Sequence, residues 1–190
     1  CLSEARGAER ESAEWIFPIY DYRDPSIKKA LWVLKYKGKK RLGSVFAEII
    51  YEKILEELSD LSTLENFTEP IIIPIPLSRE RYRERGFNQA EIICRELEKI
   101  SAERGGPQLK MEGAILIKPR ETTHQAHIKD RGERLKNVIG SFSVKDPDIL
   151  KNKNIILIDD ITTTGATLGE ARKVLRAAGA RKVIAFTVAH

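Results

Sequence analysis

Residues 154–171 read NIILIDDITTTGATLGEA and change character twice. The apolar run at 155–158 is followed at once by Asp159 and Asp160, and then by three threonines and Gly165. A short, continuous apolar run closed by polar residues is typical of a strand that is buried on both faces. The residues after Gly165 suit a helix, so the stretch predicts a strand, a loop and a helix in succession.

The loop that follows the predicted strand has the chemistry of an anion site. Ligands of parallel sheets bind beyond the carboxyl ends of the strands, and a helix N-terminus offers unpaired N–H groups and the positive end of its dipole. A glycine lets the backbone approach a ligand closely, and threonine hydroxyls donate further hydrogen bonds. The candidate phosphate-binding residues are Ile161, Thr162, Thr163, Thr164, Gly165, Ala166 and Thr167.

Asp159 and Asp160 would repel a phosphate in this loop unless a second group needs them. Adjacent carboxylates accept hydrogen bonds from the two hydroxyls of a sugar diol, as an acidic residue does for ribose in dinucleotide-binding folds. A Mg²⁺ ion shared with the ligand would further reduce the repulsion. The combination predicts a site for a ribose 5-phosphate ligand, in which Asp159 and Asp160 are the candidate catalytic residues.

Two other interpretations of the acid pair explain less. An apolar strand ending in two acids also occurs in P-loop nucleotide-binding proteins, but these need a Walker A loop as well. The nearest candidate for that loop, residues 38–45, has Ser44 and Val45 where lysine and serine or threonine belong. A solvated turn before a helix would explain the acids but not the threonines and the glycine behind them.

The remaining segments predict a single α/β domain around this unit. Predicted helices cover residues 26–36, 42–58, 88–100, about 131–138 and 166–179, with 59–70 as a polar connection. Predicted strands cover residues 71–76, 114–118, 154–158 and 182–189. Apolar strands that alternate with helices indicate a mostly parallel sheet covered by helices on both faces. We expect a helical, basic N-terminal hood at about residues 15–68 and an α/β core at about residues 69–190.

Composition favours a globular protein and excludes several other classes. Of the 190 residues, 42% are hydrophobic and 32% charged, which is ordinary for a folded domain. No apolar run approaches the roughly 18 residues of a membrane span, so we expect no membrane insertion and a cytoplasmic location. Cys1 and Cys94 cannot form a disulfide framework, and Cys94 lies in an apolar pattern that predicts a buried side chain.

Basic residues are concentrated near the N-terminus. The net charge is +5 and the pI about 9.2, which suits a polyanionic partner. Seven basic residues and no acid lie between Asp24 and Glu48, namely Lys28, Lys29, Lys35, Lys37, Lys39, Lys40 and Arg41. Trp32 and Tyr36 are interleaved with them, so this segment is a candidate surface for single-stranded nucleic acid. Alternatively, Trp32 packs inside the hood and leaves only lysines at the surface.

The sequence IILIDDITTTGAT, residues 155–167, resembles the phosphoribosyl pyrophosphate (PRPP) signature of type I phosphoribosyltransferases. Residues 20–43, 71–91 and 124–142 are similar to the ComF competence family. The first resemblance implies that the two acids bind the ribose hydroxyls, that the loop cradles the 5-phosphate, and that Mg²⁺ arrives with PRPP. The second implies a role in natural transformation, handling incoming single-stranded DNA together with the DNA-uptake machinery.

The ComF family commonly carries a four-cysteine zinc ribbon upstream, of which Cys1 would be the remnant. We therefore expect no metal bound directly by protein ligands. In type I enzymes the pyrophosphate loop follows an early core strand, which corresponds here to the segment after residues 71–76. Candidate pyrophosphate-binding residues are Arg79 and Arg85 from that segment, and Arg120, Lys129 and Arg134 from the polar stretch 119–134. Arg81 and Arg83, beside Glu80 and Glu84, are expected to be solvated.

Three functions are compatible with these features. The first is an enzyme that transfers a phosphoribosyl group from PRPP, with Mg²⁺, to an acceptor that the sequence does not identify. The second is a non-catalytic competence protein that binds single-stranded DNA. The third is a regulator that senses PRPP without turnover.

Overall fold

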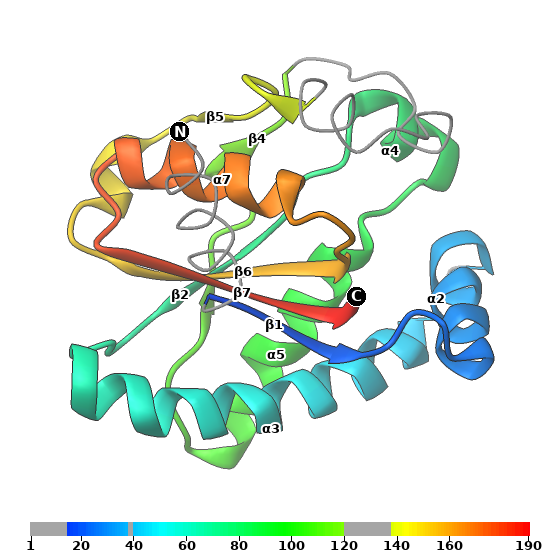
Figure 1. The fold of residues 1–190 in the computed structure, drawn as a ribbon, viewed down its shortest axis with the longest axis horizontal. Helices are drawn as coiled ribbons and strands as arrows, with labels where there is room; N and C mark the ends of the chain where they lie inside the picture. The colour runs from blue at the N-terminus through cyan, green and yellow to red at the C-terminus, as the bar shows by residue number, and fades with distance from the viewer. Residues whose placement is uncertain (1–14, 38–39, 120–137) are drawn as a thin grey trace, which may run out of the picture.

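The computed structural model describes residues 15–37, 40–119 and 138–190. A five-stranded parallel sheet in the order β1-β7-β6-β2-β3 forms its centre (Figure 1). Its strands are β1 (Ile16–Tyr20), β2 (Ile71–Pro74), β3 (Lys110–Met111), β6 (Asn154–Ile161) and β7 (Lys182–Ala189). The strands β4 (Leu116–Ile117) and β5 (Ser143–Val144) pair separately and antiparallel. This architecture confirms the predicted α/β class with a mostly parallel sheet.

Helices cover the sheet on both faces, as predicted. In Figure 1, α7 lies on one face, while α3 and α5 lie on the other. The helices are α2 (Pro25–Lys37), α3 (Lys40–Glu65), α4 (Arg79–Arg85), α5 (Gln89–Arg104) and α7 (Ala166–Ala177), with a 3₁₀ turn, η2 (Pro147–Leu150). Among the residues described, no helix combines the length and apolarity that crossing a bilayer requires.

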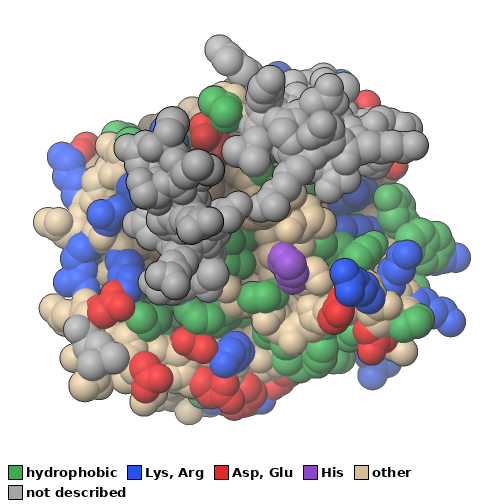
Figure 2. Space-filling model, in the orientation of Figure 1, with side chains coloured by type: hydrophobic (Ala, Val, Ile, Leu, Met, Phe, Trp, Pro, Cys, Tyr) green, Lys and Arg blue, Asp and Glu red, His purple; other side chains and the backbone are tan. Residues whose placement is uncertain are grey.

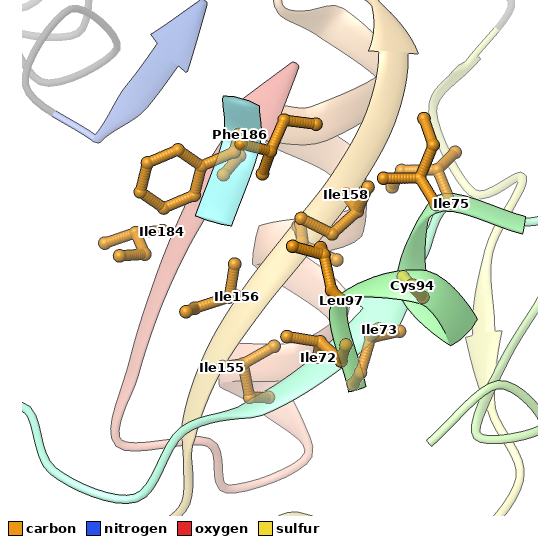
Figure 3. Close-up of a cluster of buried hydrophobic side chains, with 14 of the residues drawn as sticks. Ile72, Ile73, Ile75, Cys94, Leu97, Ile155, Ile156, Ile158, Ile184 and Phe186 are labelled. Atoms are coloured by element: carbon orange, nitrogen blue, oxygen red, sulfur yellow. The ribbon is translucent and has the colours of Figure 1, made fainter. Parts of the chain in front are cut away.

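The core forms between the central strands and α5. Side chains of β2, β6 and β7 meet Cys94 and Leu97 of α5 in one apolar cluster (Figure 3). Cys94 is fully buried, as the apolar pattern around it predicts, and burial raises the pKa of its thiol. Asn88 caps α5 by accepting a hydrogen bond from the Ala90 N–H at 3.1 Å. Because β2 pairs in parallel with β6, both strands end at the same edge of the sheet.

Two predicted boundaries were wrong. Residues 114–118 do not form a strand of the main sheet, because only Leu116 and Ile117 pair, with β5; the edge strand next to β2 is β3 instead. Helix α3 continues through most of the predicted connection and ends at Glu65, since Leu58 and Leu61 still contact the core. The backbone turns only at Asn66, whose φ is 52°.

Strand β1 was not predicted. It pairs in parallel with β7, with Ile16 opposite Ala185. Pro18 lies within it, which a strand tolerates at the edge of a sheet, where the missing N–H removes no ladder bond. Residues 15–68 therefore contribute a strand and the long helix α3 to the main layers. Only α2 stands beside the end of the sheet, apart from those layers (Figure 1).

Candidate functional site

A pocket of about 210 Å³ opens beyond the carboxyl ends of β2 and β6, where α7 begins. Segments far apart in the sequence form its wall. The lining residues are Lys35, Ile75, Pro76, Leu77, Ser78, Arg81, Arg85, Lys118 and the continuous stretch 159–168. All the predicted phosphate-loop residues and both acids therefore line one cavity.

The two acids differ in their surroundings. The carboxylate of Asp159 accepts a hydrogen bond from the Asp160 N–H at 2.8 Å. Burial, and then the charge of Asp160, raise the pKa of Asp159 to about 8, although Lys35 and the backbone hydrogen bond act in the opposite direction. Asp160 forms an ion pair with Lys35, whose Nζ lies 2.9 Å from Asp160 Oδ2. Burial of two adjacent acids is unfavourable, and a hydroxyl-bearing or cationic ligand would stabilise their charges.

The loop behind the acids has the geometry of an anion cradle. Gly165 adopts φ 71° immediately before α7 and serves as its N-cap. A Cβ at this position would lie 3.2 Å from Ile16 Cδ1 of β1, so the edge strand and the loop are closely packed. The Thr162 N–H donates to Ala189 O at 2.9 Å, which ties the loop to the end of β7. Ala166, Thr167 and Leu168 of the first turn of α7 line the pocket, at the helix end where N–H groups have no partner within the helix.

Four cationic side chains, Lys35, Arg81, Arg85 and Lys118, line the pocket together with these acids. Arg81 and Arg85 lie four residues apart on α4, so they project from one face of the helix. Arg85 Nη1 also donates to Gln89 Oε1 at 3.1 Å. Burial, and then the charge of Arg81, lower the pKa of Lys118, an effect that Asp159 partly offsets. Guanidinium and ammonium groups suit an anionic group of a ligand.

Several candidate residues lie elsewhere than expected. Arg79 is exposed and outside the pocket lining, whereas Arg81, which was expected to be solvated, lines the pocket. The cause is the start of α4: Ser78 caps the helix by accepting from the Arg81 N–H at 3.3 Å, which turns Arg79 outwards. Arg83 is exposed, as expected. Arg120, Lys129 and Arg134 lie outside the described residues.

Lys118 was missed by the sequence analysis. It follows the two-residue strand β4, and nothing in the local sequence distinguishes it from the many other lysines. Its placement depends on how the β4–β5 pair packs beside α7, outside the main sheet, which the sequence pattern does not reveal.

Lys35 was wrongly grouped with the surface lysines, because its side chain is only 18% exposed and pairs with Asp160 inside the pocket. Its neighbours in the basic segment divide as follows. Lys28, Lys29, Lys37 and Arg41 are exposed, while Lys39 and the side chain of Lys40 lie outside the described residues. The basic segment therefore contributes both to the pocket and to the surface.

The aromatic residues of α2 form an exposed pair. Trp32 is 51% exposed and Tyr36 53% exposed, so Trp32 does not pack inside the hood. Their ring centroids lie 5.7 Å apart. The Lys37 ammonium lies 5.8 Å from the Trp32 ring centroid and the Arg85 guanidinium 5.5 Å from that of Tyr36. In Figure 2, hydrophobic and basic side chains gather at the right-hand end of the molecule, over α2.

Comparison with known proteins adds independent information. Residues 83–190 match the family model described as phosphoribosyl transferase domain. The chain is 34% identical over 154 residues to competence protein ComFC of Streptococcus pneumoniae, covering 81% of this chain and 59% of that protein. Identity to ComFC of Bacillus subtilis is 32% over 175 residues, covering 90% of this chain and 62% of the relative.

A third relative, the DNA utilization protein YhgH of Escherichia coli, is 25% identical over 165 residues, covering 87% of this chain and 67% of that protein. The chain spans about three fifths of the length of the two competence proteins. The family match includes both acids, the phosphate loop and Arg85. The chain therefore belongs to the phosphoribosyltransferase domain family and, within it, to the ComF family.

Proposed function

We propose that the pocket binds a phosphoribosyl ligand, PRPP in the first instance. One observation carries the proposal: the acid pair, the threonine-glycine loop and four cations of three separate segments line a single cavity. In the proposed complex, Asp159 and Asp160 accept hydrogen bonds from the ribose hydroxyls, and the loop with the first turn of α7 holds the 5-phosphate. Arg81, Arg85 and Lys118 supply positive charge for the pyrophosphate.

The acid pair also fits a Mg²⁺ ion that enters with the ligand. Carboxylate oxygens are the ligands that Mg²⁺ prefers, and it is commonly held by one or two of them together with substrate phosphates. Burial, and then the charge of Asp160, raise the pKa of Asp159, and a cation bound beside it would stabilise its charged form. When bound, Mg²⁺ would neutralise charge on the pyrophosphate; Asp159 and Asp160 would hold it through the ligand whose ribose hydroxyls they bind, in keeping with the expectation of no direct protein ligand.

Transfer of the phosphoribosyl group is the activity such a site would support. The bond between C1 of the ribose and the pyrophosphate oxygen would break, pyrophosphate would leave with the bonding electrons, and an acceptor nucleophile would form a bond to C1. The pocket residues would position the ligand and stabilise the charge of the leaving group. A regulator that senses PRPP without turnover would need the same binding residues. Release of pyrophosphate in the presence of candidate bases or amines distinguishes an enzyme from such a regulator.

PRPP with Mg²⁺ is expected to stabilise the wild-type protein by about 2.7 kcal/mol at a ligand concentration of about 100 times Kd. The double variant Asp159→Asn/Asp160→Asn should show a much smaller gain over its own ligand-free form, because a neutral amide oxygen accepts from a hydroxyl more weakly than a carboxylate does and attracts no cation. Thermal unfolding measures the gain in stability of the wild type and of the variant, and a calorimetric titration measures their affinity for PRPP.

The matched control is Asp146→Asn/Asp148→Asn, which removes the same charge from two exposed positions and should respond to PRPP as the wild type does. An equal gain in stability for the pocket variant, or none for the wild type, would contradict the proposed site.

A second function is favoured by the exposed pair Trp32 and Tyr36 on α2. We propose that single-stranded DNA binds this surface, with bases stacked on the rings and phosphates near Lys28, Lys29, Lys37 and Arg41. The names of the relatives, competence protein and DNA utilization protein, support a role of this chain with DNA. We propose that this role is the handling of a strand taken up into the cytoplasm.

Trp32→Ala is expected to weaken binding of a single-stranded oligonucleotide by about 1–3 kcal/mol, since stacking of one base contributes that much. Fluorescence anisotropy measures the affinity, and binding of the wild type should weaken steeply with salt. Tyr82→Ala is the control, because Tyr82 is equally exposed but lies on α4, outside the aromatic pair. Equal losses in both variants, or an affinity that does not change with salt, would argue against this surface.

A further inference from the structure

We propose that α2 couples the pocket to the Trp32–Tyr36 pair, so that a phosphoribosyl ligand and single-stranded nucleic acid bind with positive cooperativity. The proposal rests on the proposed function and adds to it a means of regulation. Two cationic contacts, one from α2 and one from α4, connect the two sites.

The first contact is the ion pair between Lys35 and Asp160. Lys35 Nζ and Asp160 Oδ2 are 2.9 Å apart, and the two side chains are only 18% and 12% exposed. The ammonium group therefore pairs with an acid that the ribose hydroxyls, or a cation bound with them, would use. A ligand that binds the Asp160 carboxylate must displace the ammonium group of Lys35, which is a residue of α2.

The second contact is made by Arg85. Its guanidinium lies 5.5 Å from the centroid of the Tyr36 ring and also lines the pocket. A guanidinium over an aromatic face takes up the surface on which a base would stack. A pyrophosphate group in the pocket would offer Arg85 charge-assisted hydrogen bonds, which are stronger than a contact with an exposed ring. The ligand therefore draws Arg85 away and leaves the face of Tyr36 open.

Helix α2 is placed to transmit the change. Its buried anchors to the rest of the protein are Leu31 and Leu34, and the helix stands outside the main layers (Figure 1). Trp32 and Tyr36 lie one turn apart, on either side of Lys35 in the sequence. A shift of α2 that releases Lys35 from Asp160 therefore moves both rings. By linkage, the nucleic acid must raise the affinity for the ligand by the same factor.

Anisotropy titrations of a fluorescent single-stranded oligonucleotide, with and without saturating PRPP and Mg²⁺, test the coupling. We expect the oligonucleotide to bind about 5-fold more tightly, or better, when PRPP is bound. Calorimetry on the same samples reports PRPP binding by itself. If both ligands bind and the oligonucleotide affinity is unchanged or lower, the coupling is refuted while the proposed function stands. If PRPP does not bind, both are refuted.

Lys35→Met removes the charge but keeps the length of the side chain. In this variant, the oligonucleotide affinity without PRPP should rise towards that of PRPP-saturated wild type, and the enhancement by PRPP should shrink. The matched control is Lys29→Met, on the exposed side of the same helix; it should weaken oligonucleotide binding equally with and without PRPP. Full enhancement in Lys35→Met would overturn the role of the ion pair.

A readout that involves no nucleic acid comes from tryptophan fluorescence. Trp15 and Trp32 are the two tryptophans of the sequence, so Trp15→Phe leaves Trp32 as the single reporter on α2. Addition of PRPP and Mg²⁺ should change the emission of Trp32 and its quenching by acrylamide. The same addition to a variant that also carries Lys35→Met should produce a smaller change. An unaltered Trp32 signal at PRPP saturation would mean that α2 does not respond to the pocket.

Discussion

Asp159→Asn is expected to make the ligand-free protein more stable than the wild type at pH 9 and to change its stability little near pH 4. The folded-state pKa of Asp159 is raised from the ordinary 3.8 to about 8 by burial and by Asp160. Between these values the folded protein binds more protons than the unfolded chain. The free energy of unfolding of the wild type therefore falls as the pH rises from about 4 to about 8.

Asparagine cannot ionise, so the variant loses this pH-dependent penalty and keeps a polar side chain of nearly the same shape. The gain above pH 8 should amount to a few kcal/mol, because each unit of pKa shift corresponds to about 1.4 kcal/mol, and the raised pKa already includes the opposing effect of Lys35. Urea denaturation at pH 4, 7 and 9 measures it.

The control Asp148→Asn removes an exposed acid that pairs with Lys151 on the surface. It should leave the shape of the stability-versus-pH curve as it is in the wild type. Parallel curves for the wild type and Asp159→Asn would contradict the raised pKa. The expected outcome, a variant that is more stable but lacks the proposed ligand site, is typical of residues kept for function at the expense of stability.

Local sequence patterns were sufficient to predict the strand, loop and helix at the centre of the fold. β6, the loop and α7 follow from a buried apolar run, a glycine at the helix start and an amphipathic helix, each within a few residues of the next. The two acids and the phosphate loop could be predicted together because they occupy one strand-to-helix transition. Strand β1 could not, because Pro18 argues against a strand unless it is known to lie at a sheet edge.

The cationic side of the pocket could not be predicted, because it depends on tertiary placement. Which arginines of α4 face the pocket depends on where the helix begins, and a shift of one residue rotates the face by about 100°. Lys35 is one of many basic residues in its segment, and only the position of α2 at the end of the sheet brings it to Asp160. The same placement leaves Trp32 exposed. Charge patterning showed that this segment was basic but not which of its charges were already paired.

Gly165→Ala is expected to reduce the affinity for ribose 5-phosphate by at least about 10-fold, which corresponds to about 1.4 kcal/mol. The left-handed conformation at φ 71° costs a residue with a Cβ about 1–2 kcal/mol. The new methyl group would also lie 3.2 Å from Ile16 Cδ1. Relief of this strain would turn the loop and the first N–H groups of α7 away from the phosphate. Calorimetric titration with ribose 5-phosphate measures the loss, and the stability of the free protein should fall as well.

Gly169→Ala is a matched control one turn further along α7, where an added Cβ meets no atom within 4 Å. Since alanine is favoured over glycine inside a helix by about 0.5–1 kcal/mol, this variant should be slightly more stable than the wild type and bind ribose 5-phosphate equally well. Opposite effects of the same substitution at neighbouring positions would separate the role of the loop conformation from general effects on α7. If Gly165→Ala bound ribose 5-phosphate as tightly as Gly169→Ala, the 5-phosphate could not be held by this loop, and the orientation of the ligand in the pocket would have to be reversed.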